Sequence, residues 1–446
     1  MSARPSPAIR WLAMAACRTF YRIDRIGAAP ADGAALLLPN HPNALLDPAL
    51  VWATAGRDVR FLAKSPLFDG PLGPILRGAR AIPVYRRIDA GADVSRNAEM
   101  FRAVSAALGG GDAVCLFPEG ISHSTGRLEP LRTGAARMAL AAEQQGAPVA
   151  LVPVGLNFDR KTTFRSRVTV VFGAPFSSRD LLPESDAGLP SAVRALTDRI
   201  ADRMRCLLVE ADPKGDAALV ERVDRLYAAA RQRPIDPEER LARRRIIAAG
   251  IARLRAGDPA RYGALLLRLR RYDQRLRRFG LRDRHLDWRV DTGDAVRFAI
   301  RELALAGVLV PVSLAGLILF VVPYRLTGVA ARLTARDRDV IATAQVIAGF
   351  LIHGAWLALL CAAAWQLGGR MAATAAGILL PILAVASLAA LERESAVLET
   401  VRAWLQLRRA RTTTRERLRR HRSELADVLD EVRSWLDSSS PVVRGP

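Results

Sequence analysis

The stretch LLLPNHPNALLDPAL, residues 36–50, decides how the sequence is interpreted. An apolar run with the character of a β-strand, Leu36–Leu38, stops at Pro39. His41 and Asp47 follow, and each stands directly before a proline. A residue before proline is disfavoured in helical geometry, so both side chains are expected at the edges of a loop. Loops at strand ends are where α/β proteins place binding and catalytic residues.

His41 and Asp47 are six positions apart, and on one straight helix they would point to different faces. If they meet, they therefore meet across a loop. The proline at position 48 suits the first turn of a helix, with Asp47 as its N-cap. The simpler alternative is an N-cap aspartate beside a surface histidine.

The composition points to an anionic partner. The chain has 446 residues and a formal net charge of +22, and half of its residues are hydrophobic. Such a charge suits nucleic acid, an anionic lipid surface, or an acidic carrier with phosphorylated substrates. The basic helices lack a recognition motif and stacking aromatics, so no nucleic-acid partner is expected.

The four cysteines argue against a metal site and against a disulfide framework. They are scattered, without a CxxC pair, which fits a reducing compartment. They are Cys17, Cys115, Cys206 and Cys361. No metal is expected. The apolar stretch of residues 11–17 is too short and too closely flanked by arginine for a secretory signal.

The chain divides by composition into five parts. They are an amphipathic membrane-associating segment (1–33), a domain of alternating strands and helices (34–185), an Arg-rich helical region (186–302), a membrane region (303–391) and a helical C-terminal tail (392–446). The first part contains a candidate amphipathic helix over 6–27. It lies on a membrane surface or packs on the next domain.

Short apolar runs alternate with helical stretches in the second part. The expected strands are Ala34–Leu38, Val59–Leu62, Ala81–Tyr85, Ala113–Phe117, Ala150–Leu156 and Val168–Phe172. Helical periodicity covers Asn97–Leu108 and Thr133–Gln144. The pattern predicts an α/β sheet with functional loops at strand ends. Pro153 places the fifth strand at an edge or a kink.

In the Arg-rich region, arginine recurs every three to four residues among leucines and isoleucines. The helices there either turn an apolar face to a partner helix or hold a basic surface against anionic lipid.

Three uncharged stretches are long enough to cross a bilayer core of ~20 residues. They are Leu303–Tyr324, Val340–Leu367 and Met371–Leu391. The second and third are joined by a connector with one charge, which predicts a hairpin with its turn outside. Arginines flank the first stretch on both sides, so the positive-inside rule favours a re-entrant or broken segment with both termini cytoplasmic. A plain three-span bundle is the alternative.

Three further segments place polar residues at strand ends. LFPEGISHS (116–124) presents Glu119 and Gly120 in a turn, and ARAIPVYRR (79–87) ends in Arg86 and Arg87. An arginine pair there suits a phosphate clamp. The third segment is VALVPVGLN (149–157).

Together, the four ordered blocks NHPNALLD, IPVYRR, FPEG and LVPVG resemble the phospholipid/glycerol acyltransferase family over about residues 30–180. HPNALLDPAL, FPEGISHSTGRLEPLRTGAARMAL and GLNFDRKTTFRSRVTVVFGAP look more narrowly like the fungal-type glycerol-3-phosphate/dihydroxyacetone-phosphate acyltransferases. Five residues separate His41 from Asp47, as in that branch, where the wider family has four. Tyr85 stands where the family often has Asp. The resemblance implies an acyltransferase sheet with flanking helices.

The chemistry is then acyl transfer from a thioester to an alcohol. An alcohol needs a positioned base at neutral pH, and His41 is the candidate, with Asp47 accepting a hydrogen bond from the other ring nitrogen. No acyl-enzyme is needed, so Cys115 is expected to be an ordinary buried cysteine.

The acceptor is expected to be held by Lys64, Arg86 and Arg87 through its phosphate, and by Glu119 through a hydroxyl. Gly120 would let the backbone come close. Arg165 and Arg167 are weaker phosphate candidates, and His123 is expected to be structural.

The sequence therefore predicts a membrane-bound enzyme that acylates glycerol-3-phosphate, using acyl-CoA or acyl-carrier protein as co-substrate and no cofactor. Its expected partners are an anionic bilayer, the acyl donor and a phosphorylated glycerol acceptor. Its expected location is the inner membrane, with the catalytic domain facing the cytoplasm. Lysophosphatidate is an alternative acceptor, and a non-catalytic lipid- or nucleic-acid-binding membrane protein is the alternative of another class.

Overall fold

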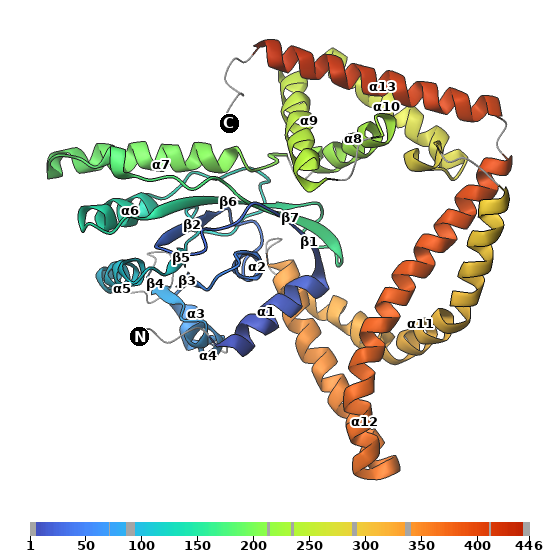
Figure 1. Cartoon of the computed structure of the whole chain (residues 1–446), viewed down its shortest axis with the longest axis horizontal. Coiled ribbons are helices and arrows are strands. Elements are labelled where there is room, and N and C mark those ends of the chain that lie inside the picture. The colour runs from blue at the N-terminus through green and yellow to red at the C-terminus, as the bar shows by residue number, and fades with distance from the viewer. Residues whose placement is uncertain are drawn as a thin grey trace. The chain divides into compact units, whose positions relative to one another are not determined.

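A computed structural model describes residues 6–70, 72–85, 94–211, 215–232, 236–287, 292–334, 340–409 and 412–439 (Figure 1). The chain forms two compact units. The first comprises residues 1–218 with 236–248 and 336–343, and the second comprises 219–235, 249–335 and 344–446.

A seven-stranded sheet forms the centre of the first unit. Its strands are β1 (Tyr21–Ile26), β2 (Ala35–Pro39), β3 (Val59–Lys64), β4 (Ile82–Val84), β5 (Ala113–Cys115), β6 (Ala150–Phe158) and β7 (Ser166–Phe172). Their order is β1-β7-β6-β2-β5-β3-β4, and only the β6–β7 pair is antiparallel. Strands β2 to β6 therefore all end at one carboxyl edge, where α/β proteins bind their ligands.

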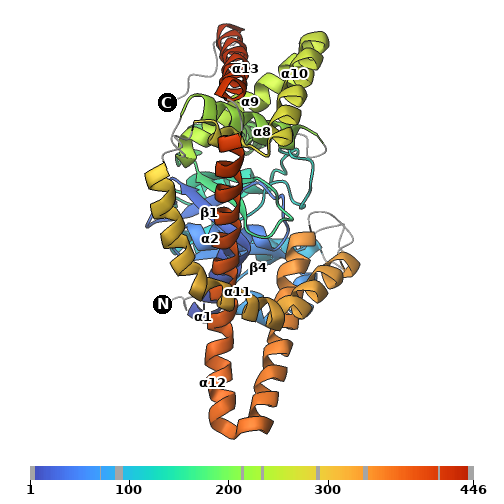
Figure 2. The same ribbon diagram turned by 90° about the vertical axis from the view of Figure 1, so that its right-hand side faces the viewer.

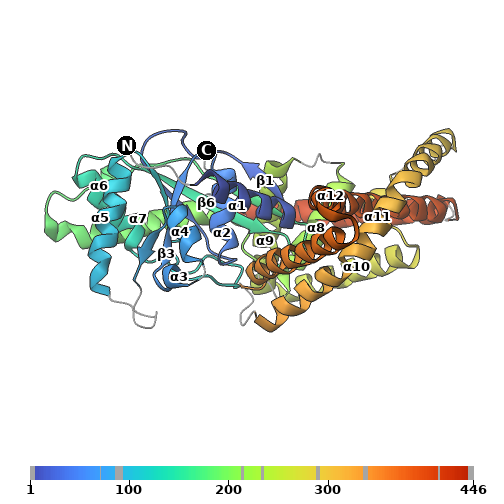
Figure 3. The ribbon, with the colours of Figure 1, turned by 90° about the horizontal axis from the view of Figure 1, so that it is seen from below.

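Helices cover both faces of this sheet. In chain order they are α1 (Pro7–Phe20), α2 (Leu46–Thr54), α3 (Pro66–Asp69), α4 (Gly73–Gly78), α5 (Asn97–Gly109), α6 (Gly134–Gln144) and α7 (Leu189–Arg205). Helices α5 and α6 lie on one side of the strands, and α1 and α2 lie on the other (Figures 1 and 3). The predicted α/β class, the six predicted strands and both predicted helices are confirmed, with ends that differ by a few residues.

Strand β1 was not predicted. The helix expected over residues 6–27 ends at Phe20, and Tyr21–Ile26 pairs in parallel with β7 at the sheet edge. The arginines among residues 21–26 obscure the alternation of apolar and polar residues that would indicate a strand. Tyr21, with 1% of its surface exposed, points into the protein, while Arg22 is exposed.

Of the two alternatives predicted for Pro153, an edge or a kink, the edge is wrong, because β6 lies between β7 and β2. The β6–β7 ladder ends at the pair Val154 and Phe172, one residue beyond the proline. The Pro153 carbonyl accepts a hydrogen bond from Gly173 N (2.9 Å). Proline has no backbone N–H to donate, but Pro153 lies just past the last pair of the β6–β7 ladder, so that ladder loses no hydrogen bond there.

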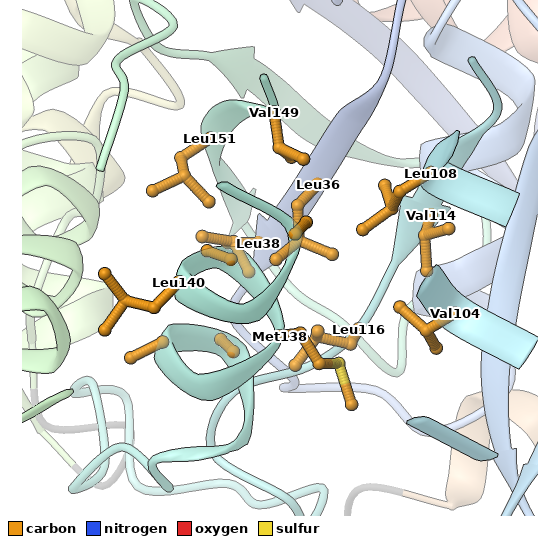
Figure 4. Packing of buried hydrophobic residues seen from close by; sticks show 14 of the residues in the cluster. Leu36, Leu38, Val104, Leu108, Val114, Leu116, Met138, Leu140, Val149 and Leu151 are labelled. Atoms are coloured by element: carbon orange, nitrogen blue, oxygen red, sulfur yellow. The ribbon is translucent and has the colours of Figure 1, made fainter. Parts of the chain in front are cut away.

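A hydrophobic core fills the space between the sheet and helices α5 and α6 (Figure 4). Strands β2, β5 and β6 contribute Leu36, Leu38, Val114 and Leu151 to it. Because alternate residues of a strand face opposite sides, Leu37 points to the other face. Strand β2 is buried along its whole length, which fixes the position of the loop that follows it.

The second unit is helical. Its elements come from α8 (Asp216–Ala230), α9 (Pro237–Gly257), α10 (Pro259–Arg278), α11 (Thr292–Thr334), α12 (Ile341–Arg409) and α13 (Thr412–Ser439). Helix α10 packs on α13 and buries Leu269, Tyr272 and Leu276. Its apolar face thus meets a partner helix, which was one of the two readings of the Arg-rich region.

Within the described residues, two helices are long and apolar enough to cross a membrane, Ile300–Thr334 and Ile341–Leu407. The second holds both of the later uncharged stretches. It leaves helical geometry at Gly368 and Gly369, where the chain turns back as a hairpin (Figure 2). Gly369 has a φ of +69°, which glycine adopts without strain.

Helix α11 packs against both limbs of this hairpin. Trp356 Nε1 donates to the Leu319 carbonyl (2.8 Å), and Ser313 Oγ donates to Glu394 Oε1 (2.8 Å). The helix contains Pro311 and Pro323 and is strongly curved (Figures 1 and 2). It continues through the expected polar connector to Thr334, so the predicted end at residue 324 is ten residues short of the observed one.

Candidate active site

The loop between β2 and α2, residues 40–45, brings the predicted histidine and aspartate together. This His41 loop places His41 Nδ1 2.9 Å from Asp47 Oδ2. Helix α2 begins at Leu46, so Asp47 lies in its first turn and is not its N-cap. The helix begins two residues before Pro48, and the Asp47 carboxylate contacts the loop from its first turn.

Asp47 is fully buried, and Oδ2 also accepts a hydrogen bond from Asn43 N (2.6 Å). Burial raises the pKa of this carboxyl, against the hydrogen bond and charge of His41, which lower it. Oδ1 has no hydrogen-bond partner among the described residues.

The His41 ring is held in one orientation. It stacks on Phe117 with ring centroids 4.0 Å apart and planes at 21°. Since an ionised Asp47 can only accept, Nδ1 carries the proton and Nε2 carries the lone pair. The His41 side chain is 19% exposed, and Nε2 has no hydrogen-bond partner in the part of the chain that the structure describes.

Glu119 ties the His41 loop to the segment after β5, residues 116–133, which we call the FPEG loop. Its Oε1 accepts from His41 N (2.7 Å), and its Oε2 accepts from Glu129 N (2.9 Å) and contacts His123 Nε2. Only 2% of Glu119 is exposed. The sequence predicted that this carboxylate binds an acceptor hydroxyl, whereas the structure gives both oxygens to protein donors.

His123 responds to this carboxylate. Burial opposes protonation of the ring, but the hydrogen bond and charge of Glu119 outweigh it, and the pKa of His123 is raised. His123 N also donates to the His41 carbonyl (3.0 Å), which joins the two loops a second time. These contacts agree with the structural role expected for His123.

Gly120 has a φ of +77°, and a Cβ there would lie 3.2 Å from Arg132 Cγ. The positive φ and this close contact favour glycine at the turn. The sequence predicted that a substrate would approach Gly120, whereas in the structure the aliphatic part of the Arg132 side chain lies against it.

The expected phosphate-binding residues are only partly described. Lys64 is exposed at the carboxyl end of β3, on the same sheet edge as His41. Arg86 and Arg87 lie outside the described residues, just after the end of β4.

The weaker candidates for phosphate binding have other contacts. Arg167 pairs with Asp24 on β1 (2.6 Å), and Arg165 Nη1 donates to the Arg18 carbonyl (3.3 Å).

Cys115 is fully buried, and burial raises the pKa of its thiol well above the usual value. A nucleophilic thiolate is not favoured there.

Sequence reasoning missed four residues that support the site. Asn40 fixes the start of the His41 loop, because its side chain bonds both Leu156 N (2.7 Å) and Leu156 O (3.3 Å). Asn43 Nδ2 donates to Tyr21 OH (2.7 Å), and the Tyr21 hydroxyl donates to the Lys161 carbonyl. The two asparagines flank His41 in the motif and could have been found there.

No group of three or more His, Cys, Asp or Glu side chains in the described ranges is placed to hold a metal ion. The site therefore consists of the His41–Asp47 pair, held by Glu119 and its neighbours at the carboxyl edge of the sheet.

Comparison with known proteins relates the domain that carries this site to acyltransferases. Residues 22–157 match the family model described as acyltransferase. Glycerol-3-phosphate O-acyltransferase 1 of Saccharomyces cerevisiae is 32% identical over 124 residues, which cover 26% of this chain and 16% of the yeast protein. Glycerol-3-phosphate O-acyltransferase 2 of the same yeast is 40% identical over 81 residues, 18% of this chain and 11% of its own.

An uncharacterized acyltransferase of Schizosaccharomyces pombe is 31% identical over 27% of this chain and 18% of its own length. Among solved structures, the 1-acyl-sn-glycerophosphate acyltransferase PlsC of Thermotoga maritima matches with a TM-score of 0.33 and 19% identity, over 44% of this chain and 77% of that chain. The chain thus spans less than a fifth of the length of these yeast relatives. Residues 22–157 form an acyltransferase-family domain.

Proposed function

We propose that this protein is a membrane-bound enzyme that transfers a fatty acyl group from acyl-CoA or acyl-carrier protein to a hydroxyl of glycerol-3-phosphate. One observation carries the proposal. His41 Nδ1 lies 2.9 Å from the buried Asp47, at the carboxyl edge of an acyltransferase-family domain. The two Saccharomyces cerevisiae relatives named as glycerol-3-phosphate O-acyltransferases support this acceptor.

In the proposed reaction, His41 Nε2 takes the proton of the acceptor hydroxyl as its oxygen attacks the thioester carbonyl. Asp47 holds the ring tautomer and stabilises the imidazolium that forms. The C–O bond forms, the C–S bond breaks, and the imidazolium returns its proton to the departing thiolate. The free lone pair of Nε2 and the complete burial of Asp47 suit these two roles.

Purified full-length protein with a labelled acyl donor tests the proposal against a panel of glycerol-3-phosphate, dihydroxyacetone phosphate and lysophosphatidate. Transfer to glycerol-3-phosphate at the highest kcat/KM is the expected result. Preferred transfer to lysophosphatidate would assign the alternative acceptor. No transfer to any acceptor, from either donor, would contradict the enzymatic function.

The phosphate clamp gives a separate prediction. Arg86→Ala should raise the KM for glycerol-3-phosphate far more than the KM for the acyl donor, because a guanidinium at the strand end would bind the acceptor phosphate. Steady-state kinetics with each substrate varied in turn measures both constants. Arg87→Ala is the matched control, with a smaller expected effect. Equal changes in both KM values would mean that Arg86 is structural or serves the donor.

A bilayer is proposed to enclose the two long apolar helices. Large apolar side chains on them are open to solvent, among them Leu367 (90% exposed) and Met371 (86%) beside the hairpin turn. Apolar surface of this extent is unfavourable in water. Arginine is dense on both flanks of the region and single in the turn, at Arg370, so the positive-inside rule favours the turn outside and both termini in the cytoplasm. This topology requires the curved α11 to enter and leave the bilayer on the cytoplasmic side.

Cysteine labelling of intact cells tests this topology in a background without the native four cysteines. Ser440→Cys, in the tail beyond the described residues, should react with an impermeant reagent only after lysis. Gln366→Cys, next to the hairpin turn, should react without lysis and is the positive control. Labelling at position 440 in intact cells, with position 366 labelled only after lysis, would defeat the model and leave a three-span bundle.

A further inference from the structure

Lys161 is a cation beside His41 whose role the sequence did not predict. It lies in the connection between β6 and β7, at the same sheet edge as His41. Its Nζ contacts the Pro42 carbonyl (2.7 Å), Ser124 Oγ (2.5 Å) and the His123 carbonyl (3.5 Å). An ammonium has three N–H donors, and these acceptors come from the two loops that hold His41. Lys161 therefore fastens the His41 loop to the FPEG loop.

The main chain of the same residue makes a second connection. The Lys161 carbonyl accepts from the Tyr21 hydroxyl, which itself accepts from Asn43 Nδ2 (2.7 Å). The side chain of Lys161 thus binds the residue after His41, and its carbonyl reaches Asn43 through Tyr21. Asn43 N in turn donates to Asp47 (2.6 Å). Lys161 thus helps to fix the backbone of the His41 loop at two points, at Pro42 directly and at Asn43 through Tyr21.

The charge of Lys161 also acts on the site. It lowers the pKa of Asp47 and opposes protonation of His123. The groups that face His41 are Asp47 on α2, Glu119 and His123 on the FPEG loop, and Lys161 after β6.

We propose that Lys161 is a positioning residue of the active site, whose ammonium joins the two loops and thereby holds His41 in place for the acceptor hydroxyl. The inference rests on the proposed acyl transfer with His41 as base. It predicts that loss of the ammonium loosens the two loops and lowers kcat, while the KM values for both substrates change little.

The test is kcat and the KM of each substrate for acylation of glycerol-3-phosphate by the purified full-length protein. Lys161→Met keeps the stem without the charge, Lys161→Gln keeps a donor without the charge, and Lys161→Arg keeps the charge. For Met and Gln we expect kcat to fall about tenfold or more, because the base is misplaced, with both KM values little changed. Lys161→Arg should retain most of the wild-type kcat, because a guanidinium also offers several N–H donors.

Arg127→Met is the control for general loss of positive charge, since Arg127 is an exposed residue of the FPEG loop. Its kcat should stay at the wild-type value. Thermal unfolding of each variant identifies those that fold, and either uncharged variant alone decides the test. A wild-type kcat in a folded Met or Gln variant overturns the role of Lys161 and leaves the proposed function intact. A wild-type protein inactive with every acceptor overturns the proposed function itself.

Discussion

His41→Ala is expected to lower kcat by at least ~10²-fold without unfolding the protein. The substitution removes the only group proposed to take the hydroxyl proton. It keeps the His41 backbone N–H that bonds Glu119 (2.7 Å), so the two loops stay joined. Steady-state kinetics gives kcat, and a thermal melt shows whether the variant is folded.

Asp47→Asn should cost somewhat less than His41→Ala. The amide fits the same space, but it can turn its NH₂ toward the ring and select the wrong tautomer. His421→Ala, which changes a histidine of the second unit, is the control and should retain wild-type kcat. A folded His41→Ala protein with near wild-type turnover would remove His41 from the mechanism.

Glu119→Gln is expected to lower kcat by about 10–100-fold while the KM for the acceptor changes little. Glu119 accepts from His41 N (2.7 Å) and Glu129 N (2.9 Å) through different oxygens, and a glutamine has only one oxygen to offer. Its NH₂ group must then face an N–H donor. An unpaired buried donor costs about 1–3 kcal/mol, which the His41 loop can relieve only by moving. Turnover should suffer because the base moves with that loop.

The kcat and KM of this variant separate two roles for Glu119. A carboxylate that binds the acceptor hydroxyl, as the sequence predicted, would raise the acceptor KM when replaced. A carboxylate that positions His41 would lower kcat. Glu129→Gln is the matched control, because it alters a neighbouring carboxylate and keeps the backbone N–H that bonds Glu119. A raised acceptor KM with unchanged kcat would restore the acceptor-binding role.

The sheet and the His41–Asp47 pair could be predicted because their signals are local. An apolar run that ends at a proline predicts a strand followed by a loop, and β2 is buried along its length as such a run requires. The prolines after His41 and Asp47 restrict the backbone on both sides of that loop. Glu119 was found for the same reason, since the FPEG turn directly follows an apolar strand.

The support of the site could not be predicted because it depends on contacts between distant segments. Tyr21 is 22 residues from Asn43, and Lys161 is 119 residues from Pro42. Neither lies in a pattern that requires a tyrosine or a lysine. The FPEG turn identified Glu119 as a candidate site residue. Its hydrogen-bond partners could not be predicted, because they depend on how the chain folds around that turn. Strand β1 was missed because its arginines make an edge strand resemble an amphipathic helix.

The pairing of β1 with β7 sets an order on folding. Tyr21 lies opposite Ser166, 145 positions later in the chain (166 minus 21). During synthesis, residues 21–26 are made long before their partner strand exists, and closing a loop of that length is entropically unfavourable until both strands are present. Tyr21 thus reaches Asn43 only after β7 has been made. Until residues 166–172 have been made, the nascent chain would therefore hold His41 and Asp47 without the tyrosine contact that supports their loop.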